Sequence, residues 1–423
     1  MTTQDIAATV GAVWRIESAK LIAALTRLLR DVGLAEEFAQ DALVKALEEW
    51  PKSGMPDNPG AWLMATAKNR ALDHWRRQRM LEEKHRMLGH EIEMEEGAPT
   101  PESEAEQGEI QDDVLRLIFI ACHPLLPPES RTALTLRLLG GLTTLEIARA
   151  FLVPETTVGQ RIVRAKKTLR DAKAPFEIPA REDLPARLAS VLEVIYLIFN
   201  EGYTATAGED LLRPMLCEEA LRIGRILAEL APQEPEVHGL VALMELQASR
   251  AGARVNAQGE PILLLEQNRG LWDRILIQRG LKALERGEAL GVERGFYLVQ
   301  AAIAACHARA ATAAATDWHA IVARYDELKR LTGSPVVELN RAVAVAMAEG
   351  PAVGLALADR LERDGALRSY HLLPSVRGDL LARLGRFKEA REEFTRAAGL
   401  TQNERERRLL HERASRCERG TLQ

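Results

Sequence analysis

The residues from 142 to 173 read as two short amphipathic helices joined by a tight turn, and this pattern constrains the fold more than any other part of the chain. Apolar residues recur at helical spacing in the first helix and give it one buried stripe. Thr143 or Thr144 is expected to cap its amino end, with Glu146 in the first turn. The residues predicted to face inward are Leu142, Leu145, Ile147, Ala148 and Phe151.

The second helix is predicted to begin at Pro154 and to be strongly basic on its exposed face. Such a helix fits the major groove of B-DNA, where its first turns reach base edges and later Arg and Lys contact phosphates. Two interpretations stay open from this stretch alone: a DNA-binding helix-turn-helix and a solvated helical hairpin. The predicted inward residues are Val158, Ile162, Ala165 and Leu169. The predicted exposed residues are Glu155, Thr156, Gln160, Arg161, Arg164, Lys166, Lys167 and Arg170.

Composition sets the fold class. The 423 residues exceed one ordinary core, so two or three domains are expected. Charged residues make up 28% and aromatic residues only 4%, and long alternating β-branched runs are absent, which predicts an all-α protein. The net charge of -5 excludes a uniformly basic nucleic-acid coat, so any DNA binding must lie in local patches.

Cysteine usage and the amino terminus indicate a cytoplasmic protein. The four cysteines are widely scattered without a CxxC pair, so we expect reduced thiols, no structural zinc site and no cofactor. The first 20 residues lack the features of a signal peptide, and the most apolar stretch, 188 to 199, is too short to span a bilayer. Adjacent Cys122 and His123 leave a hydrolytic alternative open, although no acid or second His lies nearby in sequence.

The first 80 residues predict three helices and one loop. Residues 5 to 49 form two amphipathic helices broken at Gly33, and the proline- and glycine-rich segment 51 to 60 forms an ordered loop. The second helix is expected to present to solvent or to a partner the residues Glu36, Glu37, Gln40, Asp41 and Lys45. Residues 61 to 80 form a helix whose interleaved cations and rings suit single-stranded DNA, with one of Trp62 and Trp75 expected to be structural. The predicted inward residues are Val13, Ile16, Leu21, Leu25, Leu28, Ala39, Ala42, Leu43, Ala46, Leu47, Leu63, Ala67 and Leu72.

Residues 81 to 113 are rich in acidic side chains and predict a flexible linker. Residues 112 to 139 resume a helical pattern with a break at 123 to 130. The order of these parts resembles the extracytoplasmic-function group of bacterial RNA polymerase sigma factors. The resemblance covers roughly residues 8 to 175 and rests on the segments AEEFAQDALVKAL, WPKSGMPDNPGAWLMATAKNRALDHWRRQR and LTTLEIARAFLVPETTVGQRIVRAKKTLR.

The resemblance implies three binding surfaces. The segment from 36 to 47 is similar to the helix that grips the polymerase clamp, and the residues implied are Glu37, Gln40, Asp41, Val44 and Lys45. The loop and the helix after it resemble the elements that capture a flipped base and hold the melted strand of the -10 element. The residues implied there are Met55, Asn58, Trp62, Lys68, Asn69, Arg70, Asp73, His74, Arg76 and Arg77. The acidic linker resembles the segment that threads the nucleic-acid channels of the polymerase.

The helix-turn-helix resembles the reader of the -35 element, with one departure. Where the group has Lys or Arg followed by Ser, this chain has Gly159 and Gln160. A glycine inside a helix costs about 1 kcal/mol relative to alanine. Either the backbone closely approaches DNA or a partner there, or base reading is weaker and shifted to neighbouring residues. The residues implied for the -35 element are Glu155, Thr156, Thr157, Gln160, Arg161, Arg164 and Lys167.

Residues 180 to 423 predict a succession of helical hairpins, and the residues from 378 to 397 place small and large side chains as in a tetratricopeptide repeat. Gly350 precedes Gly385 by one repeat length. The chain therefore resembles the sigma-factor subgroup with a fused repeat-like domain, and residues 200 to 227 resemble a hallmark of that subgroup. Within them, 200 to 203 form either a buried polar corner or a ligand site. The other predicted helices are 184–200, 211–230, 236–250, 261–286 and 295–311.

The resemblance implies four parts: a region-2 domain at 1–80, a linker at 81–111, a region-4 domain at 112–175 and a carboxyl-terminal domain at 180–423. The expected function is that of an alternative sigma factor, which is not itself an enzyme. Its expected partners are the clamp and flap of core RNA polymerase, promoter DNA and a protein or peptide at the fused domain, with no membrane. A helical-repeat scaffold that binds a peptide or small ligand is the alternative.

Overall fold

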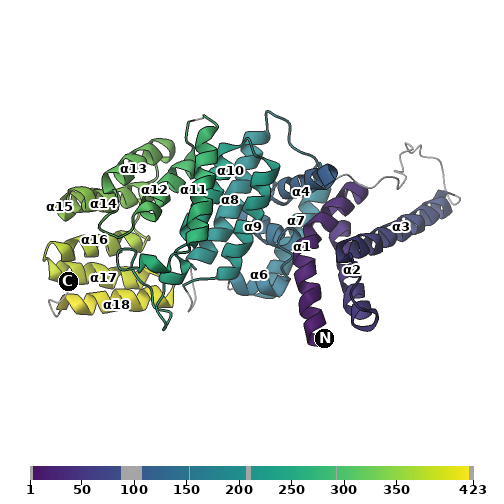
Figure 1. Cartoon of the computed structure of the whole chain (residues 1–423), viewed down its shortest axis with the longest axis horizontal. Helices are drawn as coiled ribbons and strands as arrows, with labels where there is room; N and C mark the ends of the chain where they lie inside the picture. Colours follow the sequence, from purple (N-terminus) through teal and green to yellow (C-terminus); the bar gives the residue numbers. More distant parts are fainter. Residues whose placement is uncertain (1–2, 87–106, 152, 206–210, 292, 419–423) are drawn as a thin grey trace. The chain divides into compact units, whose positions relative to one another are not determined.

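The computed structural model describes residues 3–86, 107–151, 153–205, 211–291 and 293–418 (Figure 1). The regular elements in these ranges are α-helices and two 3₁₀ turns joined by loops, and no β-strand occurs in them, which confirms the all-α fold class. None of the helices in these ranges is both long and apolar enough to cross a membrane. The chain divides into two compact units, 1–195 and 196–423.

In the described part of the first unit the chain forms seven helices and the first part of an eighth. They are α1 (Thr3–Leu29), α2 (Val32–Ser53), α3 (Pro59–Arg86), α4 (Gln107–Ala121), α5 (Pro128–Leu138), α6 (Thr144–Phe151), α7 (Glu155–Asp171) and α8 (Leu184–Tyr203). The predicted break at Gly33 is wrong, because Gly33 lies in the first turn of α2. The chain turns instead at Arg30, which has a φ of 52°, and Asp31 Oδ1 accepts hydrogen bonds from the backbone amides of Gly33 and Leu34. A side-chain cap therefore starts α2.

Large apolar side chains from α1 to α4 meet in the core of this unit. Leu25, Trp50, Leu63 and Phe119 are almost fully buried. Two residues predicted to face inward do not: Ile16 is 63% exposed and Leu47 is 43% exposed. Ile16 and Leu47 lie at the edges of the apolar stripes predicted for their helices. In α1, Trp14 is buried instead of Ile16. The helical period was correct, but the direction of the stripe was misjudged at its edges.

The ends of the predicted loop at 51–60 and of the predicted linker at 81–113 belong to helices. Residues 51 to 53 belong to α2 and residues 59 and 60 to α3, so only 54 to 58 lie outside helices. Of the predicted linker, 87–106 lies outside the described residues. Asp113, which was placed in that linker, is a buried residue of α4 and pairs with Arg27 at 3.2 Å and Arg116 at 2.6 Å. A buried carboxylate needs such partners, and the local acidic composition could not reveal them.

The first half of α8 is held against α4 and α5 by hydrogen bonds from buried polar groups. Ser190 Oγ donates to the carbonyl oxygen of Cys122 at 2.7 Å, and Arg131 donates to Ser190 Oγ at 2.5 Å. Arg187 donates to the carbonyl oxygen of Phe119 at 2.8 Å. The boundary between the two units consequently lies within α8 rather than before it.

The second unit continues as a row of helices, each packed on the next (Figure 1). They are α9 (Pro214–Leu230), α10 (Pro235–Ala248), α11 (Arg274–Ala289), α12 (Phe296–Arg309), α13 (Trp318–Thr332), α14 (Pro335–Glu349), α15 (Pro351–Asp364), α16 (Leu372–Arg383), α17 (Phe387–Leu400) and α18 (Glu404–Glu418). The helix predicted at 261–286 is wrong in its first half. Residues 254 to 268 form an irregular segment with an isolated bridge between Val255 and Pro261, and Asp273 caps α11.

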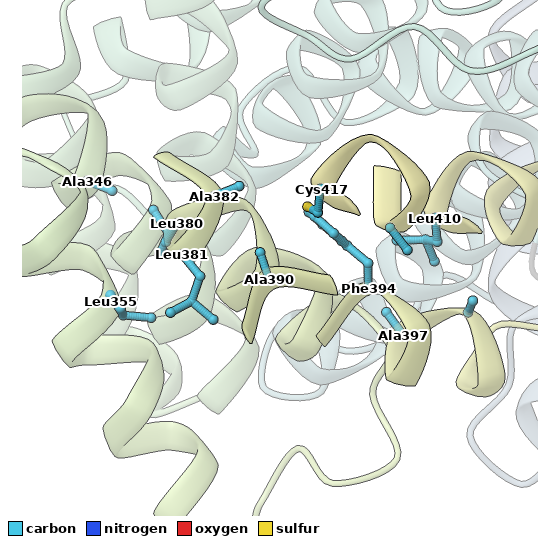
Figure 2. Close-up of a cluster of buried hydrophobic side chains, with 12 residues drawn as sticks. Ala346, Leu355, Leu380, Leu381, Ala382, Ala390, Phe394, Ala397, Leu410 and Cys417 are labelled. Carbon is cyan, nitrogen blue, oxygen red and sulfur yellow. The ribbon is translucent and has the colours of Figure 1, made fainter. Parts of the chain in front are cut away.

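The repeat pattern predicted near the carboxyl terminus is a helical pair formed by α16 and α17. A Cβ atom on Gly378 would lie 2.8 Å from the ring of Phe394, so the small residue is what allows the large ring between the helices. Phe394 is completely buried with Leu381, Ala390 and Leu410 (Figure 2). The small and large positions of the pattern therefore mark a real packing contact.

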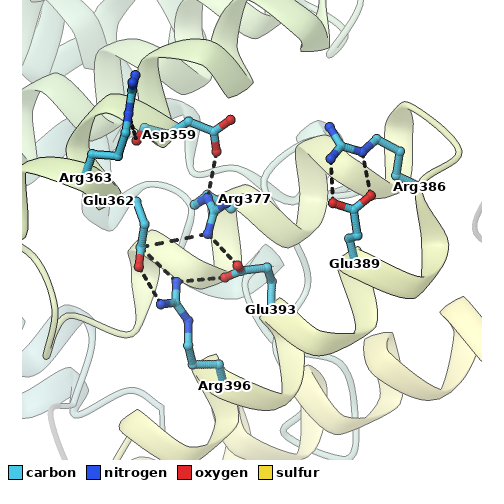
Figure 3. Close-up of polar contacts among 8 residues, drawn as sticks. All are labelled: Asp359, Glu362, Arg363, Arg377, Arg386, Glu389, Glu393 and Arg396. Atoms are coloured by element: carbon cyan, nitrogen blue, oxygen red, sulfur yellow. Dashed lines mark hydrogen bonds and ion pairs between the residues drawn. The ribbon is translucent and has the colours of Figure 1, made fainter.

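An ion-pair network joins α15, α16 and α17 on the surface of the same region (Figure 3). Arg377 donates to Asp359 at 3.0 Å and also pairs with Glu393. Arg396 binds both carboxylate oxygens of Glu362, at 2.7 and 2.9 Å. Because one arginine bridges two helices and the other forms a bidentate pair, this network fixes geometry better than isolated surface pairs do.

We expect Phe394→Ala to lower the free energy of unfolding of the second unit by about 3–5 kcal/mol, because the substitution leaves a cavity between α16, α17 and α18. Leu400→Ala on the same helix is the control and should cost no more than about 1.5 kcal/mol, since Leu400 is already 36% exposed and leaves no enclosed cavity. Hydrogen exchange in increasing urea would report each unit separately. Equal losses for both variants would contradict this packing.

Candidate nucleic-acid interface

The helix-turn-helix begins with a capping box on α6. The backbone amide of Glu146 donates to Thr143 Oγ1 at 3.1 Å, and the backbone amide of Thr143 donates to Glu146 Oε2 at 2.8 Å. The predicted cap is thus confirmed, with Thr143 rather than Thr144 in that role. The prediction that Leu145 faces inward is wrong, because this residue is 41% exposed. Ile147 and Ala148 carry the buried stripe of this short helix.

The second helix of the motif, α7, buries the predicted apolar stripe without exception. Val158, Ile162, Ala165 and Leu169 are all buried against the rest of the unit. This packing turns the basic face of α7 outward. The exposed residues among those predicted to bind the -35 element are Glu155, Thr156, Gln160, Arg164 and Lys167, while Thr157 and Arg161 are half-buried.

Lys166 departs from the prediction. It was expected on the exposed face of α7, but its ammonium group pairs with Glu36 on α2. Arg137 on α5 binds the other carboxylate oxygen of Glu36 at 2.5 Å, and Gln40 donates to the same oxygen at 2.7 Å. The helix-turn-helix is therefore joined to α2 through one buried carboxylate.

Electrostatics determine the charge state of this group. Burial alone would raise the pKa of the Glu36 carboxyl, but the Lys166 ammonium and the Arg137 guanidinium outweigh that effect and hold the pKa below its ordinary value of 4.5. Glu36 is thus ionised at neutral pH. The prediction that Glu36 faces solvent or a partner is wrong, because its side chain is buried. Local spacing could not reveal this, since its partners Arg137 and Lys166 lie 101 and 130 residues away in the chain.

The residues predicted to contact polymerase lie on one side of α2. Glu37, Val44 and Lys45 are exposed, and Gln40 and Asp41 are half-buried. Val44 is an apolar side chain with 52% of its surface in solvent. Single exposed apolar residues are common on protein surfaces, so Val44 alone does not identify an interface.

The loop and α3 carry the residues predicted for the -10 element. Met55 is 50% exposed, and Asn58 Oδ1 accepts a hydrogen bond from the backbone amide of Ala61 at 3.0 Å. Asn58 therefore caps α3 at the point where the loop ends. The exposed polar residues of this helix are Lys68, Asn69, Arg70, Asp73, Arg76 and Arg77.

The aromatic residues of α3 are partly structural. Trp62 packs edge-on against the buried Trp50, with ring centroids 5.4 Å apart. His74 lies against Phe38 at 5.4 Å, and its Nε2 atom is buried. Both are half-buried, so each presents only part of its surface to a ligand. Trp62 thus has the structural contact expected of one of the two tryptophans.

The hydrolytic alternative has no support from Cys122. Its thiol is buried, and burial raises its pKa to about 11 even though Thr135 Oγ1 lies 3.4 Å from the sulfur. A thiol with this pKa is not a nucleophile at neutral pH. Within the described ranges no group of three or more His, Cys, Asp and Glu residues is arranged to hold a metal ion.

The second unit holds a polar corner and a cavity. Arg213 pairs with Glu201, and the guanidinium of Arg254 lies 3.7 Å from the ring centroid of Tyr203. These contacts favour the buried corner among the two interpretations of 200 to 203. A cavity of about 640 Å³ lies between the irregular segment 260–266 and α14, α16 and α18, and Arg408 and Arg416 line it.

Three segments of the chain match known protein families. Residues 16–80 match the family Sigma-70 region 2, residues 116–169 match Sigma-70, region 4, and residues 187–288 match a family of unknown function, DUF6596. An uncharacterized protein of Rhizobium meliloti (strain 1021) is 45% identical over 386 residues, which cover 90% of this chain and 89% of that protein. No solved structure matches the chain.

We expect Glu36→Gln to lower the free energy of unfolding of the first unit by about 3 kcal/mol, because it leaves two cations without their buried carboxylate. Glu37→Gln is the control, since Glu37 is exposed and adjacent in sequence. Urea unfolding followed by hydrogen exchange of α2 and α7 peptides would measure both. Equal stability of the two variants would contradict the anchoring role.

The same carboxylate predicts a pH dependence. Its pKa is lowered in the folded chain, so its stabilisation is complete above the ordinary value of 4.5 and is lost as the pH falls through the folded value. The stability difference between the wild type and Glu36→Gln should therefore be constant from pH 7 down to about 5 and shrink towards pH 3. A difference independent of pH would show that Glu36 is not ionised in the fold.

Proposed function

Because the chain belongs to the extracytoplasmic-function group of sigma-70 RNA polymerase sigma factors and carries an additional carboxyl-terminal domain, we propose that three exposed surfaces of its first unit contact polymerase and promoter DNA. A sigma factor directs core RNA polymerase to promoters. The observation that carries the proposal is α7, whose apolar stripe is buried while Thr156, Arg164 and Lys167 stay exposed. The chain itself is expected to supply no catalytic group.

The polymerase-binding surface is α2. Val44 offers an apolar centre, and Glu37 and Lys45 flank it on the same exposed side. Asp41 lies 3.8 Å from Arg70 of α3, so a polymerase residue that binds Asp41 would also free Arg70 for DNA. Because this ion pair is solvated and weak, little free energy is lost when Asp41 and Arg70 exchange partners.

The -10 element is assigned to the 54–58 loop and the exposed side of α3. Base capture needs a pocket that repays the few kcal/mol of unstacking, and Met55 is an exposed apolar group next to a helix start. Lys68, Arg76 and Arg77 then follow the strand through its phosphates. Trp62 offers one partly open ring edge for stacking.

The carboxyl-terminal unit is proposed to regulate the first one, in place of a separate inhibitor, and to bind a protein or peptide. Its cavity of about 640 Å³ supports a peptide ligand, and the wall carries both arginines and carboxylates, so it offers polar contacts of either charge. A test must keep α8 whole, because Arg187 and Ser190 belong to the first unit. Truncation after residue 203 should change promoter-dependent transcription in a reconstituted assay. Unchanged transcription would contradict the regulatory role.

The alternative is a helical-repeat scaffold with no role at promoters. The two functions differ in one simple observation: a sigma factor co-elutes with core polymerase and a scaffold does not. The match of residues 16–80 and 116–169 to sigma regions favours the first.

We expect Arg164→Ala and Lys167→Ala each to weaken holoenzyme binding to promoter DNA uniformly across sequences. Each lost phosphate contact should lower the slope of log affinity against log salt by about 1. The exposed Arg286 of the second unit is the matched control, and Arg286→Ala should leave both quantities unchanged. Fluorescence anisotropy over a salt series would measure them. Unaltered slopes for the α7 variants would rule out DNA contact by this face.

A further inference from the structure

Gly159 lies inside α7 although nothing in the fold requires a glycine there. Its φ is that of an ordinary helix, and a Cβ atom at this position would meet only Thr144 Cγ2, at 3.9 Å, which is normal contact distance. Alanine would therefore fit, and it would favour the helix. The chain bears the cost of a helical glycine without any gain in internal packing.

Several other helical glycines of this protein have a packing reason, whereas Gly11 and Gly399 have open space beside them as Gly159 does. A Cβ atom would lie 2.6 Å from the backbone nitrogen of Leu298 at Gly239, and 2.7 Å from Leu246 at Gly280. At Gly354 it would lie 2.4 Å from Ala346. In these cases a neighbouring helix occupies the space. Since no such neighbour exists at Gly159, the space beside it is available to a ligand.

An exposed apolar residue lies one turn further along the same side. Val163 is 66% exposed. It follows Gly159 by four residues and precedes the cation Lys167 by four. Residues four apart are neighbours on a helix surface. Thr156, which is exposed, lies three residues before Gly159. The outward side of α7 thus carries a strip with a bare backbone at its centre and methyl groups at both ends.

We propose that Gly159 and Val163 form an apolar notch that accepts the C5-methyl group of a thymine in the -35 element. The proposal rests on the proposed function, because it assumes that this side of α7 enters the major groove. There the thymine methyl is the only apolar group on a base edge, and small apolar side chains recognise it. The missing Cβ lets the helix lie close to the base, and Val163 covers the methyl from one side.

The test uses the full chain bound to core polymerase. A promoter library randomised across the -35 element first yields the preferred duplex, and each thymine in it is then replaced by deoxyuridine, which lacks only the methyl. One replacement should weaken wild-type binding about fourfold, the effect of one buried methyl group without its contact. The same replacement should change binding of Val163→Ala less than about twofold.

Gly159→Ala and Gly11→Ala form a matched pair. Gly11 lies in α1 with no atom within 4 Å of an added Cβ, so both changes should raise or preserve the unfolding temperature. Only Gly159→Ala should weaken binding of the selected duplex, by about tenfold if the helix is held away from the base. Equal binding by both glycine variants would overturn the proposal.

The remaining outcomes separate this inference from the function on which it rests. If no deoxyuridine weakens binding, or if Val163→Ala keeps the full sensitivity, the notch is wrong. Should Arg164→Ala still weaken every duplex in that case, DNA binding by α7 would stand. If Arg164→Ala has no effect and the chain does not load polymerase onto any duplex, the proposed function itself fails.

Discussion

The carboxylate of Glu36 is the group on which the first unit depends. It is buried, and it is matched by one cation from α5 and one from α7. A buried ionised carboxylate is stable only when cations pair with it. Removal of the carboxylate would in turn leave both cations without their partner and destabilise the fold. The ion pair therefore fixes the recognition helix on one side of α2, while Glu37 and Val44 point to solvent on another.

Local rules predicted the parts of this fold that depend on short-range spacing. The stripe from Val158 to Leu169 and the cap at Thr143 both follow from residues within one or two helical turns. The repeat pattern likewise predicted the small position of Gly378 and the large position of Phe394, but not that the two are in contact. The exposed charge of α2, α3 and α7 was predictable because it is a local property of an amphipathic helix, whereas the binding roles of these helices remain predictions.

Long-range partners explain what the sequence could not predict. Lys166 and Asp113 look like solvated charges, yet each belongs to a buried ion pair whose other member lies far away in the chain. Neither composition nor helical period carries that information. The same limit applies to Ile16 at the edge of a stripe, where only the packing of three helices decides what is exposed. The sequence could nominate His74 as a site residue, but it could not predict that its ring packs against Phe38.

The charge distribution of α7 separates two tasks that DNA recognition requires. Arg164 and Lys167 are long and flexible, so they can follow phosphates whose positions vary little with sequence, and their energy depends on salt. The strip with Gly159 and Val163 has no charge and little freedom, so any contact it makes depends on shape. Salt weakens the first kind of contact and leaves the second. If α7 binds DNA as proposed, selectivity among promoters would therefore depend on the uncharged strip, and affinity on the cations beside it.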